Sequence, residues 1–232
     1  MNASFYTAAR GAMTQQERMN VISNNLANTN TIGFKSKSAV FSDLMYCVMH
    51  GQEGVTHGTG VKVERTNTDF TSGGMTASAE GGYNYYIDGD GFFMVKDQIT
   101  GEISYTRAGN FSLSVKGDEV NLITDNRKLV LDENRNTVQL VEGKLTAKPG
   151  IFKFQNTNDM QAAGFSEYIP VAKNGEPQLA EDSKLIENYL ELSNVDLAKE
   201  MSDMIITSRA YSYALKMVQT SDEVQQTING LR

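Results

Sequence analysis

Apolar residues near the N-terminus recur at a helical spacing. Phe5, Ala12, Met19 and Leu26 are seven residues apart, and Ile22 follows three residues after Met19. A seam with this repeat is typical of a helix that packs along its length against another helix. It predicts a helix from about residue 2 to residue 26, roughly 36 Å long.

A longer apolar seam lies near the C-terminus. Its members alternate steps of three and four residues, with Ser208 in one slot: Leu197, Met201, Met204, Tyr211, Leu215 and Val218. Val224, Ile228 and Leu231 continue it after a shift in register. Ser193 and Asn194 are candidate N-cap residues, and Asp196 falls in the expected first turn. The predicted helix, residues 194–231, would be roughly 55 Å long, which is typical of a coiled coil.

The middle of the chain has a different pattern, of short apolar runs separated by turn residues. All three prolines and 17 of the 20 glycines lie between residues 38 and 180, where they disfavour helices. The runs predict strands at residues 83–87, 92–96, 103–107, 110–115, 119–124, 128–132 and 137–141. Residues 40–80, rich in Thr, Gly and Ser, are interpreted as extended arms and loops.

These patterns predict an α+β protein. Long N- and C-terminal helices would form a coiled-coil layer, and the central domain would be mostly antiparallel β structure. The expected segments are an N-terminal helix with its joint (1–35), an extended arm (36–80), a central β domain (81–180) and a C-terminal helix (181–232).

Charge and composition exclude several classes of function. The net charge is −7 and no basic tract occurs, which argues against nucleic acid or an anionic membrane as partner. No apolar run is long enough for a membrane span, and the N-terminus lacks the apolar region of a cleaved signal peptide. Cys47, with His50 and His57, lacks a usual zinc spacing. We therefore expect no metal and no cofactor.

The acidic turn at residues 88–91, Asp-Gly-Asp-Gly, is the nearest approach to a ligand motif. It lacks the further oxygen ligands of a calcium loop and the third glycine of a dinucleotide site. A tight turn that leads into a buried strand explains it better. Because no catalytic pattern occurs elsewhere, we expect a protein that is not an enzyme.

The charges of the two ends favour their pairing. Residues 1–37 carry a net charge of +3, and residues 181–232 carry nine acids and five bases. Opposite charges on two amphipathic helices favour packing within one chain or between copies. The sequence thus predicts self-association, as a closed oligomer or an open helical array. The alternative from another class is a secreted β-domain binding module that its helices oligomerise.

Four stretches resemble one known family. They are SNNLANTNTIGFK (23–35), IDGDGFFMV (87–95), YTRAGNF (105–111) and NYLELSNVDLAKEMSDMIITSRAY (188–211). In this order they are similar to the signatures of the bacterial flagellar rod and hook proteins. The stretch GTGVKVERTNTDF (58–70) and the overall layout are most like the distal rod member. The proximal-rod paralogue and a hook-type axial protein remain alternatives.

The resemblance implies a structural subunit of the flagellar basal-body rod, a hollow helical tube. It implies that the terminal seams mediate assembly with copies of the chain and with other rod and hook proteins. It further implies contact with the flagellar export apparatus, export without a cleaved signal and, as a further option, contact with surrounding ring proteins. Neither nucleic acid nor lipid insertion is implied.

The resemblance also gives roles to residues of the motifs. The joint residues are Asn24, Asn25, Asn28, Asn30, Gly33 and Phe34. We expect Asn24 and Asn25 to close the last helical turn, Asn28 and Asn30 to take left-handed or Asx-turn conformations, and Phe34 to anchor the next segment. A shaped exit from the helix is favoured over a flexible linker. The β-domain motif residues are Asp88, Gly89, Gly91, Phe92, Phe93, Tyr105 and Arg107.

Overall fold

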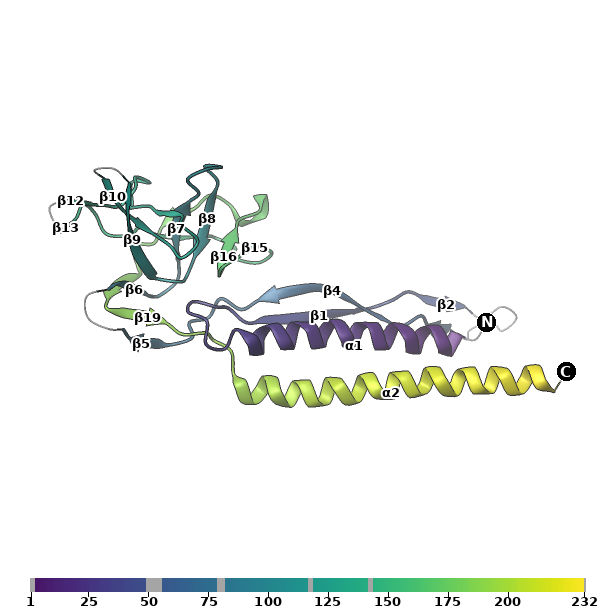
Figure 1. The fold of residues 1–232 in the computed structure, drawn as a ribbon. Coiled ribbons are helices and arrows are strands. Elements are labelled where there is room, and N and C mark those ends of the chain that lie inside the picture. Colours follow the sequence, from purple (N-terminus) through teal and green to yellow (C-terminus); the bar gives the residue numbers. More distant parts are fainter. Residues whose placement is uncertain (1–2, 49–55, 79–81, 117–118, 142–143, 232) are drawn as a thin grey trace. The chain divides into compact units, whose positions relative to one another are not determined.

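The chain forms two compact units. The computed structural model describes residues 3–48, 56–78, 82–116, 119–141 and 144–231 (Figure 1). Within these, the helical unit takes in the described parts of residues 1–27, 37–67 and 196–232. The β unit takes in those of residues 28–36 and 68–195. The units group the chain differently from the four predicted segments, because residues 28–36 belong with the β unit and residues 37–67 with the helices.

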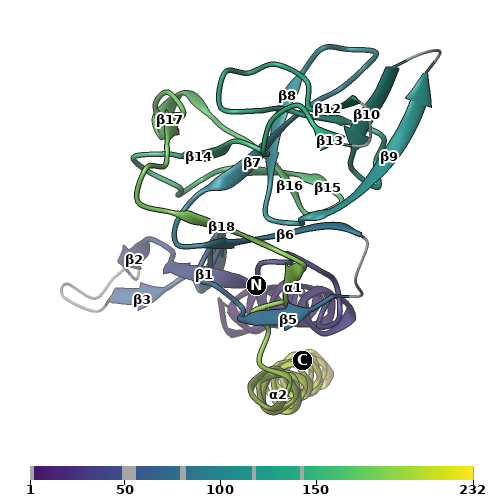
Figure 2. The same cartoon turned by 90° about the vertical axis from the view of Figure 1, so that its left-hand side faces the viewer.

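The helical unit is built on two antiparallel helices, α1 (Ala3–Ala27) and α2 (Leu197–Gly230). Ser4 Oγ lies 3.2 Å from Ser221 Oγ, and Arg18 pairs with Asp203 at 3.3 Å, so residue numbers rise in opposite directions. Strands β1 (Lys37–Asp43) and β4 (Val61–Thr68) pair with each other and run along α1 on the side away from α2 (Figures 1 and 2). Strands β2 (Tyr46–Val48) and β3 (Thr56–Gly58) pair in the same unit.

The start of α2 differs from the prediction. Its N-cap is Asp196, whose Oδ1 accepts hydrogen bonds from the backbone N–H groups of Ala198 and Lys199 at 3.0 and 3.2 Å. The carboxylate thereby satisfies two donors that have no partner within the helix. The predicted N-cap residues Ser193 and Asn194 lie before the helix, and the prediction was wrong for both.

The described residues of the β unit form short strands and one 3-10 turn. They are β5 (Met75–Ala77), β6 (Tyr83–Asp88), β7 (Phe92–Lys96), β8 (Ile103–Thr106), β9 (Asn110–Lys116), β10 (Glu119–Ile123), β11 (Leu129–Val130), β12 (Gln139–Val141), β13 (Lys144–Leu145), β14 (Ile151–Lys153), β15 (Gln161–Gly164), β16 (Glu167–Ile169), η1 (Ala172–Asn174), β17 (Gln178–Leu179), β18 (Lys184–Glu187) and β19 (Tyr189–Glu191). The predicted strand runs correspond to β6 through β12.

One antiparallel sheet organises most of the β unit. In the described residues its main path is β15-β16-β8-β7-β11-β10-β9-β6-β18, and β12, β13, β14 and β17 branch from it. Strands β5 and β19 pair separately. The α+β class and the mostly antiparallel sheet are therefore confirmed.

Strand β7 is buried on both faces, which explains its unbroken apolar run. Successive side chains of a strand point to opposite sides. Phe93 and Val95 pack into one core cluster, with Ile87 and Leu122 among its other members. Phe92 and Met94 pack into a second cluster, with Tyr105, Phe152 and Tyr168. Strand β7 thus lies between two apolar layers.

Candidate assembly site

The predicted seam of α1 lies mostly on covered parts of the helix. Ala12 and Ile22 are buried, and Met19 and Leu26 are half-buried. Phe5, in the first described turn of α1, is 36% exposed. The structure therefore brings this seam to the faces of α1 that pack within the helical unit.

The side of α2 that packs on α1 is shifted by about one position from the predicted seam. Its members are at least half-buried: Glu200, Asp203, Met204, Thr207, Ala210, Tyr211, Ala214, Val218 and Ser221. Thr207 is fully buried. Small residues let two helices approach closely, but a seam predicted from large apolar residues does not include them. Met204, Tyr211 and Val218 of the predicted seam belong to this side.

The other predicted seam residues of α2 face outward. Leu197, Met201 and Leu215 are 45%, 50% and 40% exposed. At 3.6 residues per turn they lie within about 40° of one another on the helix. We call them the second exposed stripe, because a longer first exposed stripe lies on another side of α2. The structure shows only that these residues are exposed, so the role in assembly predicted for them remains a proposal.

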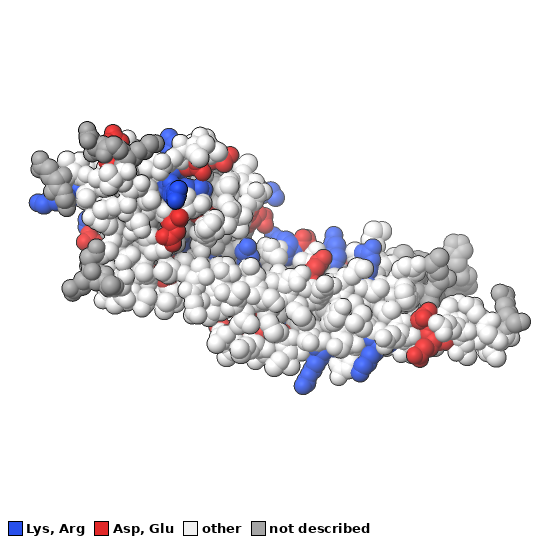
Figure 3. Space-filling view, viewed as in Figure 1, with Lys and Arg blue, Asp and Glu red and all other residues white. Residues whose placement is uncertain are grey.

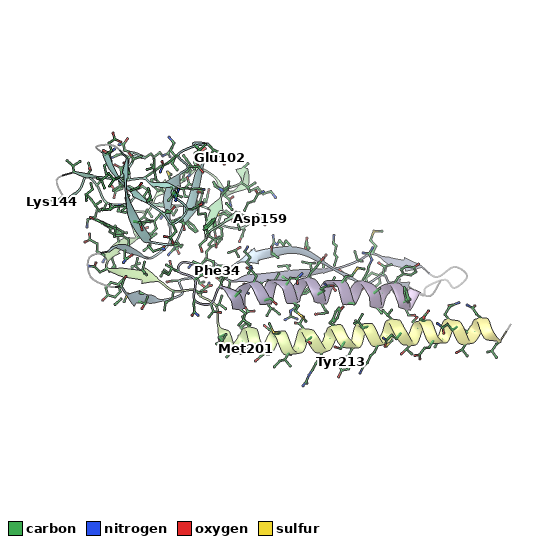
Figure 4. The ribbon with its side chains drawn as sticks, in the orientation of Figure 1. Phe34, Glu102, Lys144, Asp159, Met201 and Tyr213 are labelled. Carbon is green, nitrogen blue, oxygen red and sulfur yellow. The ribbon has the colours of Figure 1, made fainter. Side chains whose placement is uncertain are left out.

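A first exposed stripe runs along α2 to its C-terminal end. Its members are all about half-exposed or more: Ile206, Tyr213, Met217, Val224, Ile228 and Leu231. Steps of seven, four, seven, four and three residues place them within about 60° of one another. Charged side chains are sparse along α2 on the face shown in Figure 3. Figure 4 marks Met201 and Tyr213, from the two stripes, on α2.

The C-terminal turns of α2 extend beyond its partner helix. Ser4, near the start of α1, lies beside Ser221. All described residues from 222 to 231 are exposed. Apolar residues of the first exposed stripe in these turns therefore have no α1 residue opposite them within the described part of the chain.

Asn25 holds the strand that returns from the joint. Its side-chain amide donates to Lys37 O at 2.8 Å and to Glu200 Oε1 at 2.9 Å, and its Oδ1 accepts from Lys37 N at 2.9 Å. Asn25 is 1% exposed, whereas its neighbour Asn24 is exposed. The amide thus acts as a pairing partner for β1 and links it to α2, a role that the helix-closing prediction did not foresee.

The turn after α1 owes its left-handed residue to glycine. Thr31 N donates to Asn28 O at 3.1 Å, and Thr31 Oγ1 donates to Asn28 Oδ1. Neither Asn28 nor Asn30 has a positive φ, so the left-handed alternative predicted for them is wrong and the Asx-turn alternative stays a prediction. Gly33 has φ 65°, and a Cβ there would lie 2.5 Å from Ala108 N. Only glycine fits such a position without strain.

Residues 28–36, which we call the strap, end in a buried charge cluster. Lys35 Nζ lies 2.6 Å from Glu191 Oε1 and donates to Thr71 O at 2.8 Å. Arg107 Nη1 lies 3.3 Å from Glu191 Oε2, and its Nη2 donates to Gly89 O at 2.8 Å. Lys35, Glu191 and Arg107 are 0%, 1% and 3% exposed. One carboxylate therefore serves two buried cations that come from distant parts of the sequence.

The electrostatics of this cluster are unbalanced. Burial lowers the pKa of Lys35, and the nearby Glu191 carboxylate opposes that effect. Arg107 also packs its guanidinium 5.6 Å from the centre of the Phe92 ring. Its Nε atom is buried and has no hydrogen-bond partner in the described residues. Phe34, next to Lys35, is buried, and the anchor role predicted for it stays a prediction.

The acidic Asp-Gly-Asp-Gly stretch is a turn between β6 and β7, as the sequence predicts. Gly89 and Gly91 have φ 120° and 139°. A Cβ on Gly91 would lie 2.6 Å from the Ile151 side chain. Asp88 is exposed, and the motif aromatics Phe92, Phe93 and Tyr105 belong to the core clusters. Arg107, another β-domain motif residue, pairs with Glu191, the same carboxylate that Lys35 of the strap contacts.

Asn194 is a further residue whose role the sequence did not reveal. Its Oδ1 accepts from Ser36 N at 2.7 Å, and its Nδ2 donates to Asp69 O at 2.9 Å and to Thr71 O at 3.2 Å. The side chain ties the end of the strap to the segment before β5. Asparagine before a helix suggests an N-cap, and no local signal distinguishes this use from capping.

The described residues contain no group of three side chains suited to a metal ion. His50 and the side chains of Cys47 and His57 lie outside the description. No described helix is both long and apolar enough to cross a membrane.

Comparisons with known proteins cover the strap, the β unit and both helices. Residues 5–35 match the family model described as flagella basal body rod protein. Residues 86–151 match the flagellar hook protein FlgE/F/G D1 domain, and residues 186–231 match the flagellar basal body rod FlgEFG protein C-terminal model.

Full-length relatives agree with these matches. The flagellar basal-body rod protein FlgG of Buchnera aphidicola (subsp. Acyrthosiphon pisum) is 30% identical, with all of both chains covered. FlgG of Caulobacter vibrioides is 31% identical over 97% of this chain and 98% of the relative. FlgG of Bacillus subtilis is 30% identical, with all of both chains covered. The resemblance seen in the sequence is thereby confirmed, and the chain belongs to the family of flagellar basal-body rod proteins.

Proposed function

We propose that the chain is a subunit of the distal part of the flagellar rod and that it polymerises through the exposed faces of α2. Copies of the chain and other axial proteins would be its neighbours. The helices would form an inner coiled-coil layer, and the β unit would form an outer layer. Export by the flagellar export apparatus and contact with surrounding rings belong to the same proposal.

The exposed apolar stripes of α2 are the observation that carries the proposal. One side of α2 packs on α1, and two further sides expose Ile206, Tyr213, Met217, Leu197 and Met201. A surface helix of a finished globular protein keeps one apolar face inward and polar residues elsewhere. Apolar residues on two more sides indicate that α2 is packed from several directions in its working state.

The geometry of the stripes favours an open array over a closed pair. The two stripes lie on different sides of α2, separated on one side by the face that packs on α1. A neighbour that covers one stripe leaves the other free for a further neighbour. Contacts through two unlike surfaces are heterologous, and heterologous contacts extend into rings or helical filaments.

Substitutions in each of the two exposed stripes of α2 test the proposal. Met217→Asp and Leu215→Asp each place a carboxylate in one of the exposed stripes, and burying that charge in an interface is costly. We expect each variant to fold normally and to fail in rod assembly. Thr220→Asp is the matched control, because it adds the same charge at an exposed position outside both stripes.

The measurement is made in cells that lack the natural copy of the protein. Basal bodies are isolated and viewed by electron microscopy, and circular dichroism of each purified variant checks its helix content. Complete rods with Met217→Asp and Leu215→Asp would refute the proposed interface. Equal loss of rods with Thr220→Asp would show that the stripes have no special part in assembly.

A further inference from the structure

The buried cluster around Glu191 contains two cations, Lys35 and Arg107, but only one carboxylate. Arg107 and Glu191 form a neutral pair at 3.3 Å, and both belong to segments of the β unit other than the strap. Lys35 adds a second positive charge on the other carboxylate oxygen, at 2.6 Å. Asp69, which also acts electrostatically on Lys35, is exposed.

Removing the strap would therefore leave a balanced interior. A buried charge without a partner is strongly destabilising, whereas a buried pair is tolerated. With Lys35 withdrawn, Glu191 keeps Arg107, and its Oε1 keeps the Gly73 N–H at 3.4 Å. The β unit thus has its own electrostatic balance before Lys35 arrives.

The strap fits a narrow path that excludes side chains at one point. Gly33 N donates to Glu191 O at 2.9 Å. A Cβ added at Gly33 would lie within 2.8 Å of backbone atoms of Arg107 and Ala108. Ser36 N then reaches Asn194 Oδ1 at 2.7 Å. Gly33, Lys35 and the backbone amide of Ser36 therefore each make a specific contact with the rest of the β unit.

We propose that residues 28–36 form a latch, a strap that docks through Lys35 into a site of the β unit whose Arg107–Glu191 pair is already neutral. The site takes a segment with glycine two positions before lysine. The latch opens while the rest of the β unit stays folded. If the protein assembles as proposed above, an opening latch gives the chain a place to change its path between α1 and β1 during assembly.

A second buried ion pair of the same unit provides the control. Lys128 Nζ lies 2.5 Å from Glu167 Oε2, and the two side chains are 12% and 3% exposed. Here the charges match one to one. Lys128→Met leaves a buried carboxylate without its cation, whereas Lys35→Met leaves the Arg107–Glu191 pair intact. The same chemical change is therefore expected to destabilise the β unit at Lys128 and to leave its stability unchanged at Lys35.

Amide hydrogen exchange of the purified, unassembled protein tests the latch. In Lys35→Met we expect the amides of Gly33 and Ser36 to exchange roughly 10- to 100-fold faster, which is the range for losing a hydrogen bond to a charged group. Core amides such as Leu122 N, bonded to Val138 O, should keep their rates. Lys128→Met should lower the denaturation midpoint of the β unit, and Lys35→Met should not.

Two further variants keep the test decisive. Gly33→Ala expels the strap by steric conflict with all charges in place, and it should reproduce the local exchange pattern of Lys35→Met. Glu191→Gln leaves two buried cations and should destabilise the β unit, and adding Lys35→Met should restore part of that loss.

Three results would overturn the latch. One is equal acceleration of strap and core amides in Lys35→Met, because the strap would then be inseparable from the fold. Another is unchanged exchange at Gly33 and Ser36. The third is a destabilisation by Lys35→Met, or a failure to fold, that matches Lys128→Met. None of these results depends on whether rods form.

Discussion

At the scale of single residues, the amides of Asn25 and Asn194 replace strand partners at two consecutive points of the chain. Asn194 holds Ser36 within the β unit, and Asn25 holds Lys37 within the helical unit. Each amide offers both a donor and an acceptor, so it can satisfy backbone groups that no neighbouring strand reaches. The asparagines near the joint thus serve pairing, and Gly33 supplies the left-handed turn.

Asn25→Asp should destabilise the helical unit. The substitution keeps the acceptor for Lys37 N, removes both donated bonds and places a carboxylate beside Glu200 Oε1. We expect a loss of about 2–3 kcal/mol in the free energy of unfolding, because buried acceptors lose their donor and like charges repel. Chemical denaturation followed by helical circular dichroism measures it. Asn24→Asp, on the exposed neighbour, is the control, and an equal loss there would contradict the assigned role.

At the scale of elements, the helices show what an apolar pattern can and cannot predict. The pattern located both helices because large apolar residues recur along them. It placed the α1-facing side of α2 about one position away, because Thr207, Ala214 and Ser221 on that side are small or polar. Strands β6 through β12 were predicted well, since each is a short run of apolar and β-branched residues between turn residues.

The cap of α2 gives a prediction that separates two neighbouring polar residues. Asp196→Ala removes the acceptor for Ala198 N and Lys199 N and should cost about 1 kcal/mol, with less helix near residue 197. Asn194→Ala should leave the helix start intact and speed amide exchange at Ser36. Site-resolved hydrogen exchange reports both effects. Fraying of α2 in Asn194→Ala would restore the sequence-based assignment of the cap.

At the scale of the whole molecule, the chain is a structural protein of the flagellar basal-body rod whose two units interleave along the sequence. The opposite charges of the two ends predicted that the helices pair, and within this chain α1 and α2 do pack, with Arg18 beside Asp203. The division into units was not predictable, because it depends on contacts such as Lys35 with Glu191, which lie 156 residues apart. No local pattern shows which distant carboxylate a lysine will reach.

The β unit should lose stability in alkaline solution. Burial raises the pKa of Tyr85 and Tyr105 to about 12, and it raises that of Tyr168 as well. Above pH 10 the unfolded chain releases these protons and the folded chain keeps them, so the free energy of unfolding falls as pH rises. Each tyrosine contributes a slope of up to about 1.4 kcal/mol per pH unit between pH 10 and 12. Lys35 acts in the opposite direction, because its lowered pKa makes the folded chain lose a proton first, and its effect is complete near its ordinary pKa of 10.5.

Denaturant titrations between pH 8 and 11.5, followed by a probe of the β unit, measure this fall. Tyr105→Phe should remove one tyrosine from the slope, because the ring stays in the core cluster and the titrating hydroxyl is gone. Tyr46→Phe, at an exposed position of the helical unit, is the control and should leave the slope unchanged. A slope that Tyr105→Phe does not reduce would mean that groups other than the buried core tyrosines govern the alkaline loss.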